Sequence, residues 1–337
     1  MSATIKTELT ELLRIRVPIV SASMVEVSRA GGFGFFGVAG FTREKLRDEL
    51  SYARTHTSDL QDKPLPIGCG FLGWMLELKE DEYRPLLDIV IEAGVRAIWL
   101  SFGNNLDRWI QYIRNATANI PSVRKPLLFV QVTTVEEALR AANEWKVDVI
   151  VAQGNESGGH GRSTAPSTMV LLSEILAALP RDSIPPVLAA GGISNGAQIA
   201  AYLTAGASGA VLGTRFVLTP ESTYSDAQKN VLKAAKSSQT VRSLAFDQAR
   251  GTNNWPDGID GRGIRNGIVR DIESGVDEET TQEKYRAAVQ AGDTNYMVIW
   301  SGQGISLIND IKPARAVVEE LSAGAVQALR RAQRLLA

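Results

Sequence analysis

Residues 186–216, PVLAAGGISNGAQIAAYLTAGASGAVLGTRF, decide the fold class of this chain. Two apolar runs, 186–190 and 210–212, flank a helical pattern at 195–205, and glycines follow each run. Apolar residues at consecutive rather than alternate positions are typical of parallel strands that are buried on both faces. The stretch therefore predicts a strand–helix–strand unit of a parallel sheet.

Six further apolar runs precede this unit. They lie at 17–21, 33–38, 65–69, 97–100, 126–132 and 148–151. Helical patterns separate them: Thr42 is placed to cap one helix, and Thr134 with Glu137 predicts a capping box at the start of another. Eight strands with intervening helices predict an α/β protein, a TIM (β/α)8 barrel. A doubly wound open sheet is the alternative, but such sheets usually contain fewer parallel strands.

A polar segment at residues 223–294 interrupts the pattern. It holds helical patterns at 227–236 and 278–291 around a loop rich in glycine and asparagine, and it lacks apolar runs typical of strands. We predict a small helical subdomain inserted after the eighth strand. Residues 1–222 and 295–337 would then form the barrel.

Composition and charge exclude several classes of function. The chain of 337 residues has 36 Lys and Arg against 37 Asp and Glu, scattered along its length, so we expect no nucleic-acid partner. No apolar run approaches the ~20 residues of a membrane helix, and residues 1–16 are too charged for a signal peptide, so we expect a cytoplasmic protein. Whether the chain associates into a homo-oligomer stays open.

Metal chemistry is not expected either. The chain has a single cysteine, Cys69, and two histidines, His56 and His160. This set cannot form a disulfide, a cysteine-based zinc site or a histidine-rich site. We therefore expect any difficult chemistry to need an organic cofactor.

Two glycine-containing loops predict a phosphate site. Ala190, Gly191 and Gly192 follow the seventh strand, and Gly213 and Thr214 follow the eighth. In TIM barrels the loops after these two strands usually hold phosphate, and glycines let backbone N–H groups approach an anion. Tight turns alone would explain either loop, but both loops at the appropriate strands favour phosphate.

His160 is the candidate for proton transfer. It lies in QGNESGGHGR, residues 153–162, directly after the sixth strand, where active sites of this barrel are found. Histidine titrates near neutrality, and a flexible loop would let it reach a bound ligand. The alternative is a surface histidine that is hydrogen-bonded to backbone. The position of His160 after the sixth strand favours a functional role instead. His56, in a polar run before the third strand, is expected to be structural.

Further residues of the same rim are candidates for ligand contacts. The chain following the first strand, Ala22, Ser23 and Met24, would approach a ring, and two amides, Gln131 and Gln153, would hydrogen-bond the edge of a heterocycle. Three indoles are candidates for packing over an aromatic ligand, although barrel core or an interface is the favoured interpretation for each: Trp74, Trp99 and Trp300.

The chain resembles the nitronate monooxygenases, formerly called 2-nitropropane dioxygenases, in four segments along nearly its whole length. These are PIVSASM with AGGFGFFG (18–24 and 30–37), QGNESGGHGR (153–162), LAAGGISNGAQIAAYLTAGASGAVLGTRF (188–216) and WSGQGISLINDIKPA (300–314). The resemblance implies an FMN-containing barrel with a small helical domain. The same superfamily includes flavin-dependent enoyl reductases of fatty-acid synthesis.

The resemblance also assigns roles to individual residues. It matches His160 with the family's catalytic histidine and Gln131 with a position where many members have a lysine. The remaining implied contacts are with FMN. Ala22, Ser23 and Met24 would face the flavin ring, Gly158 and Gly159 would line the cofactor, and Gly191, Gly192, Gly213 and Thr214 would hold its phosphate.

The implied activity is the oxidation of alkyl nitronates, and of nitroalkanes as a further candidate, with O2 to a carbonyl compound and nitrite. Three departures bear on the substrate: Ser23 replaces the usual proline, Gly70 a common asparagine and Ser157 a common alanine. One alternative is an NAD(P)H-dependent flavin reductase acting on an enoyl thioester or quinone. Another is a non-catalytic flavin-binding protein, which would not need the proton-transfer group of His160.

Overall fold

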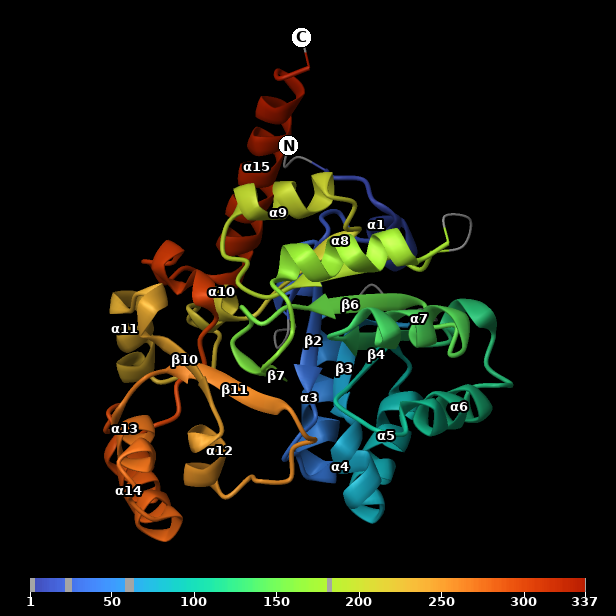
Figure 1. The fold of residues 1–337 in the computed structure, drawn as a ribbon. Helices are drawn as coiled ribbons and strands as arrows, with labels where there is room; N and C mark the ends of the chain where they lie inside the picture. The colour runs from blue at the N-terminus through green and yellow to red at the C-terminus, as the bar shows by residue number, and fades with distance from the viewer. Residues whose placement is uncertain (1–3, 22–25, 58–63, 181–183, 337) are drawn as a thin grey trace.

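The computed structural model describes residues 4–21, 26–57, 64–180 and 184–336 (Figure 1). Eight parallel strands close into a barrel in the order β1-β2-β3-β4-β5-β6-β8-β9. Their bounds are β1 (Ile19–Ser21), β2 (Phe33–Gly37), β3 (Leu65–Leu72), β4 (Val95–Ser101), β5 (Leu127–Val132), β6 (Val149–Gln153), β8 (Val187–Ala190) and β9 (Gly209–Leu212). The ring closes where Ile19 of β1 pairs with Ala210 of β9. This confirms the predicted TIM barrel.

Helices surround the sheet. Those of the barrel are α2 (Glu26–Arg29), α3 (Arg43–His56), α4 (Gly73–Leu78), α5 (Glu80–Ala93), α6 (Leu106–Ala116), α7 (Val135–Asn143), α8 (Thr168–Ala178), α9 (Gly196–Thr204), α10 (Thr214–Val217) and α15 (Ala314–Gln333), and α15 packs on α9. Thr42 caps α3 as expected. At α7 only half of the predicted capping box forms, because the Glu137 carboxylate accepts from Thr133 instead of reaching the Thr134 N–H.

Aromatic side chains fill the interior of the barrel. The Phe35 ring meets Phe33, Trp99 and Phe129 edge to face, each with ring centroids 5.1 Å apart. Trp99 is therefore a core residue rather than a ligand contact. Helix α1 (Glu8–Leu13) closes the amino-terminal end, where Leu9 and Leu13 join the same cluster. Active sites of this fold lie at the opposite end, at the carboxyl ends of the strands.

The segment after β9 contains strands, which corrects the expectation that residues 223–294 lack them. It folds as α11 (Asp226–Ala234), β10 (Thr240–Ser243), α12 (Ala245–Arg250), β11 (Ile259–Ile264), α13 (Gly267–Glu273) and α14 (Glu278–Ala291). Strands β10 and β11 form an antiparallel sheet with β7 (Gly159–Arg162), in the order β10-β11-β7. The sequences TVRS and IDGRGI carry no long apolar run, and their arginines donate to the backbone carbonyls of Gly161 and Asn155.

Short 3-10 helices complete the described chain at Ser122–Arg124, Ser237–Gln239 and Gln303–Leu307. Among the described residues, no helix is both long and apolar enough to cross a membrane. That same part of the chain contains no group of three or more His, Cys, Asp or Glu side chains suited to hold a metal ion. The division of the chain at residues 222 and 295 stays a prediction.

Candidate active site

The sequence predicted that His160 lies on a flexible loop. In the structure it lies on strand β7 instead. Residues 154–158 lead from the carboxyl end of β6 to β7, and His160 there pairs with Gly261 of β11. Pairing with β11 converts the glycine-rich run into a strand, which explains the difference. The side chain of His160 is 11% exposed, so the imidazole is shielded but not sealed.

A carboxylate and two indoles hold the imidazole. His160 Nε2 lies 2.9 and 3.0 Å from the two carboxylate oxygens of Asp247, which α12 supplies. The ring stacks on Trp255 with centroids 3.5 Å apart and an interplanar angle of 13°, and its edge meets Trp300 at 4.9 Å. Burial lowers the pKa of His160 below its usual 6.5, while the hydrogen bond and charge of Asp247 act in the opposite direction. The neutral imidazole is therefore the dominant form at pH 7.

Two amides connect the barrel to β7. Gln131 Nε2 donates to Gln153 Oε1 at 3.0 Å, and Gln153 Nε2 donates to the carbonyl of His160 at 3.1 Å. The chain of hydrogen bonds runs from β5 through the end of β6 to β7. It brings three of the predicted site residues together and ties the strand that carries the histidine to the barrel rim.

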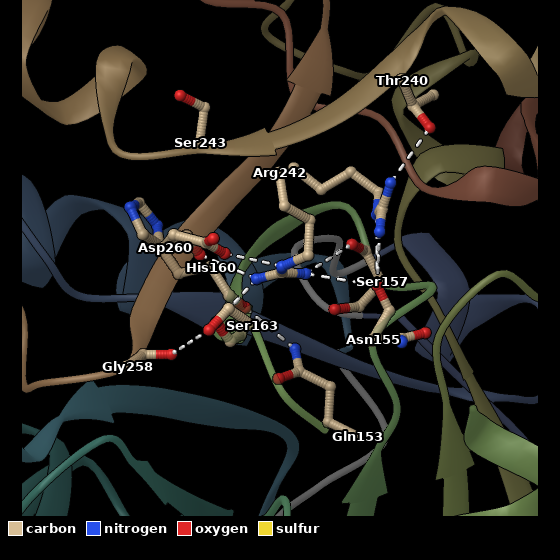
Figure 2. A network of polar contacts seen from close by, with 12 residues as sticks. Gln153, Asn155, Ser157, His160, Ser163, Thr240, Arg242, Ser243, Gly258 and Asp260 are labelled. Carbon is tan, nitrogen blue, oxygen red and sulfur yellow. Dashed lines mark hydrogen bonds and ion pairs between the residues drawn. The ribbon is translucent and has the colours of Figure 1, made fainter. Parts of the chain in front are cut away.

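Two arginines donate to the Asn155 carbonyl in the 154–158 connection, and Figure 2 shows one of them, Arg242. Arg242 donates from Nε to Asp260 at 2.6 Å and from Nη2 to the Gly161 carbonyl at 2.6 Å. Arg262 donates from Nε and Nη2 to the Asn155 carbonyl at 3.1 and 3.0 Å. Burial, with Arg242 adjacent, lowers the pKa of Arg262 to about 10. Both guanidinium groups stay charged at pH 7.

The two predicted phosphate loops lie against the chain at residues 301–304. Gly302 N–H donates to Thr214 Oγ1 at 2.9 Å, and Ser194 Oγ donates to the Gly304 carbonyl at 2.9 Å. Gly191 and Gly192 have φ of 127° and 67°, which glycine adopts readily. The motif WSGQG thus joins the loops after β8 and β9.

Several donors near these loops have no partner. Within the described residues, the backbone N–H groups of Gly192, Thr214 and Arg215 donate to no acceptor. In the part of the chain that the structure describes, Ser157 Oγ is buried without a hydrogen bond, and nothing lies within 4 Å of a Cβ built on Gly213. Unpaired donors around an open position are what an oxyanion such as phosphate requires.

The two glycines before His160 serve different purposes. A Cβ on Gly158 would lie 2.5 Å from the backbone nitrogen of Gly302, so glycine here allows the close approach of residues 301–304. Gly159 has φ of 70° and open space around its Cβ position. The predicted contacts Ala22, Ser23 and Met24 lie outside the described residues.

The remaining predicted residues divide between the site and the surface. The Trp74 ring lies 5.2 Å from Trp255, and its Nε1 is buried without a hydrogen-bond partner. His56 is exposed and stacks on Tyr52 with centroids 3.9 Å apart, in line with the structural role expected for it. A cavity of about 460 Å³ opens beside Gln131 and Trp255, large enough for a small organic molecule.

Sequence reasoning missed four residues of this site: Asp247, Trp255, Arg242 and Arg262. Asp247 stands between residues that are buried in α12, in the run LAFDQAR. One aspartate beside apolar residues is too common to identify a partner for a histidine 87 positions away. Only the pairing of β7 with β11 brings the two segments together.

Comparisons find related proteins along nearly the whole chain. The family model for nitronate monooxygenase matches residues 7–324. The chain is 33% identical to a nitronate monooxygenase of Neurospora crassa, with 91% of this chain and 86% of that protein covered. It is 32% identical to the nitronate monooxygenase npaC of Metarhizium robertsii, with 88% and 85% covered.

Two solved structures share the fold across nearly the whole chain. FabK from Thermotoga maritima has a TM-score of 0.78 at 27% identity, with 98% of this chain and 100% of that chain covered. A nitroalkane oxidase from Streptomyces ansochromogenes has a TM-score of 0.76 at 28% identity, with 96% and 99% covered.

Proposed function

Because the chain belongs to the nitronate monooxygenase family, we propose that it oxidises alkyl nitronates, and nitroalkanes as further substrates, with O2 to a carbonyl compound and nitrite. The observation that carries the proposal is the buried imidazole of His160, hydrogen-bonded to Asp247 beside the carboxyl end of the barrel. Substrate and O2 are both small molecules. A cytoplasmic location and association into a homo-oligomer remain predictions from the sequence.

FMN is the cofactor that we propose. The backbone N–H groups of Gly192, Thr214 and Arg215, which have no acceptor among the described residues, fit its phosphate, as does the position at Gly213, open in that part of the chain. The buried hydroxyl of Ser157 is a further donor without a partner. FMN, when bound, supplies the one-electron and O2 chemistry that no side chain of this site can perform.

The chain itself handles the proton and the substrate's position. His160 takes the proton from the carbon next to the nitro group, or, once protonated, holds the nitro oxygens of a substrate that arrives as the anion. Trp255 and Trp300 cover the imidazole and keep bulk water from it. Gln131 and Gln153 keep β7 in register with the rim of the barrel.

Two measurements test the proposal. The purified protein is expected to show the visible absorption of bound flavin, alone or after addition of FMN, and to release nitrite from ethyl nitronate in the presence of O2. A protein that stays colourless with added FMN would overturn the cofactor assignment. Turnover unaffected in His160→Asn would overturn the role of the histidine and favour a flavin-binding protein without this catalysis.

The phosphate site can be tested with a matched pair of glycine variants. Gly192 and Gly292 have φ of 67° and 71°, so alanine imposes the same backbone strain at both. Only Gly192 lies in the proposed phosphate loop, where the new Cβ would also lie 3.0 Å from Glu156. We expect Gly192→Ala to weaken FMN binding at least roughly tenfold in a fluorescence titration. Equal affinity in the two variants would contradict the assignment.

The likeness to FabK favours a second candidate, a flavin reductase that uses NAD(P)H. The barrel and the phosphate loops serve either reaction, so a kinetic experiment must separate them. Under anaerobic conditions, bleaching of the flavin by ethyl nitronate within the turnover time supports the monooxygenase. Bleaching by NADPH on that timescale supports the reductase.

A further inference from the structure

We propose that Asp247 is a positioning residue that keeps the proton of His160 on Nε2 and leaves Nδ1 as the base toward a neutral nitroalkane. The inference rests on the proposed function for the identity of the substrate. Its structural part, the protonation of one ring nitrogen, can be tested without any substrate.

The surroundings of Asp247 are those of an ionised carboxylate. Its side chain is 1% exposed and accepts from His160 Nε2 at 2.9 and 3.0 Å, from Thr252 Oγ1 at 2.9 Å and from Trp255 Nε1 at 3.1 Å. Arg250 Nη1 lies 4.0 Å from Oδ1 of Asp247. A buried carboxylate needs such donors, and the hydroxyl of Thr252 and the N–H of Trp255 both donate to Oδ1.

The hydrogen bond determines which nitrogen of the imidazole carries the proton. A neutral imidazole has one N–H, and a carboxylate only accepts hydrogen bonds, so the proton lies on Nε2. Nδ1 then carries the lone pair. In the described part of the chain Nδ1 has no hydrogen-bond partner, so it is available to take a proton.

Asp247 also sets the orientation of the ring. Trp255 stacks on the imidazole at 3.5 Å and donates its own Nε1 to the same carboxylate. Trp300 meets the edge of the ring at 4.9 Å. The Asp247 carboxylate therefore holds both His160 and Trp255, the indole that restricts rotation of the imidazole.

The Asp247 carboxylate compensates the positive charge that His160 gains in the proton transfer. The C–H bond next to the nitro group breaks, its electron pair forms the C=N bond of the nitronate, and the proton bonds to Nδ1. The resulting imidazolium lies against Asp247, whose negative charge stabilises it. A substrate added as the nitronate needs no such step, so loss of Asp247 should affect the neutral substrate more.

The other charges that face His160 act against its protonation. Arg250 on α12 and Arg242 on β10 both lower the pKa of the imidazole, as burial does, and Asp247 alone raises it. Removing the charge of Asp247 therefore lowers the pKa of His160 further. The base then becomes weaker even where it is unprotonated.

The direct test is the ¹⁵N NMR spectrum of protein labelled in its histidines. The chain has two histidines, and His56→Gln assigns the signals of the other. We expect the wild-type His160 to show the Nε2–H form alone, and Asp247→Asn to shift it toward a mixture with a lower pKa. A wild-type His160 with its proton on Nδ1 would overturn the proposal, whether or not any variant folds.

Kinetics supply the second readout. We expect Asp247→Asn to lose roughly 100-fold in kcat with nitroethane and less than roughly tenfold with ethyl nitronate, and its pH profile to shift to lower pH. Asp271→Asn is the matched control, because that carboxylate bonds Lys284 and Tyr296 instead. Equal losses with both substrates, or an unchanged histidine signal in Asp247→Asn, would refute the positioning role.

The two hypotheses fail in different ways. If the wild-type protein turns over neither substrate but shows the Nε2–H form, the proposed function is wrong and the structural role of Asp247 stands. If it turns over both substrates and His160 carries its proton on Nδ1, the function stands and the role of Asp247 is wrong.

Discussion

Gly261 of β11 should not tolerate a methyl group, because the indole of Trp300 lies directly over it. A Cβ built on Gly261 would lie 2.4 Å from Cζ3 and 2.6 Å from Cη2 of Trp300. An ordinary contact starts at 3.4 Å, so the indole would have to move by about 1 Å. Phe246 packs on the same ring at 5.3 Å and is fully buried, which limits movement in its direction.

The cost of Gly261→Ala follows from this overlap. Overpacking of a filled core typically costs about 1–3 kcal/mol of unfolding free energy. The backbone of Gly261 lies outside the left-handed region, so no conformational strain adds to this. The displaced indole also moves against His160, whose ring it meets at 4.9 Å, so nitrite release should fall together with stability.

Gly37→Ala is the matched control. Gly37 is also a strand glycine with ordinary φ, and a Cβ there would meet nothing within 4 Å. Alanine at such a site is neutral or stabilises by about 0.4–1 kcal/mol through the unfolded chain. Urea unfolding of both variants, with nitrite assays on each, measures the difference. Equal unfolding free energies and equal activities would refute the placement of Trp300 over β11.

Two further predictions follow from the buried groups of the site. With a neutral nitroalkane, kcat/KM should fall at acid pH, because His160 must be unprotonated, and it should reach half of its maximum below pH 6.5, because burial lowers the pKa of His160. A half-maximal point above pH 6.5 would contradict this. Arg242→Met should lower the free energy of unfolding by roughly 3 kcal/mol, because it leaves the carboxylate of Asp260 without its partner. Arg265→Met removes only an exposed ion pair with Glu273 and should lower it by less than about 1 kcal/mol. Denaturant unfolding of the two variants checks the comparison.

Local sequence patterns were sufficient for the barrel. Continuous apolar runs identify strands that are buried on both faces. The residues that make up each run lie within a few positions of each other in the chain. The positions of the two glycine-containing loops were predictable for the same reason, since Gly191 and Gly213 directly follow their strands. The position of His160 after β6 placed it at the correct end of the barrel.

The sheet around His160 could not be predicted from local sequence patterns. Strands β7, β10 and β11 lack long apolar runs, and Arg242 and Arg262 donate to carbonyls far away in the sequence. No local period marks such strands, so the segment was expected to be helical. The half-formed capping box at Glu137 has the same origin, because Arg162 of β7 pairs with that carboxylate.

By itself, the sequence determined the class of fold, the end of the barrel that carries the site and the presence of a histidine there. Each of these depends on residues that are neighbours in the chain. The tertiary structure alone decided that Asp247 and Trp255 hold that histidine, because they come from a segment 87 and 95 residues further along. Contacts between such distant segments depend on how the strands pair, and no local pattern records that pairing.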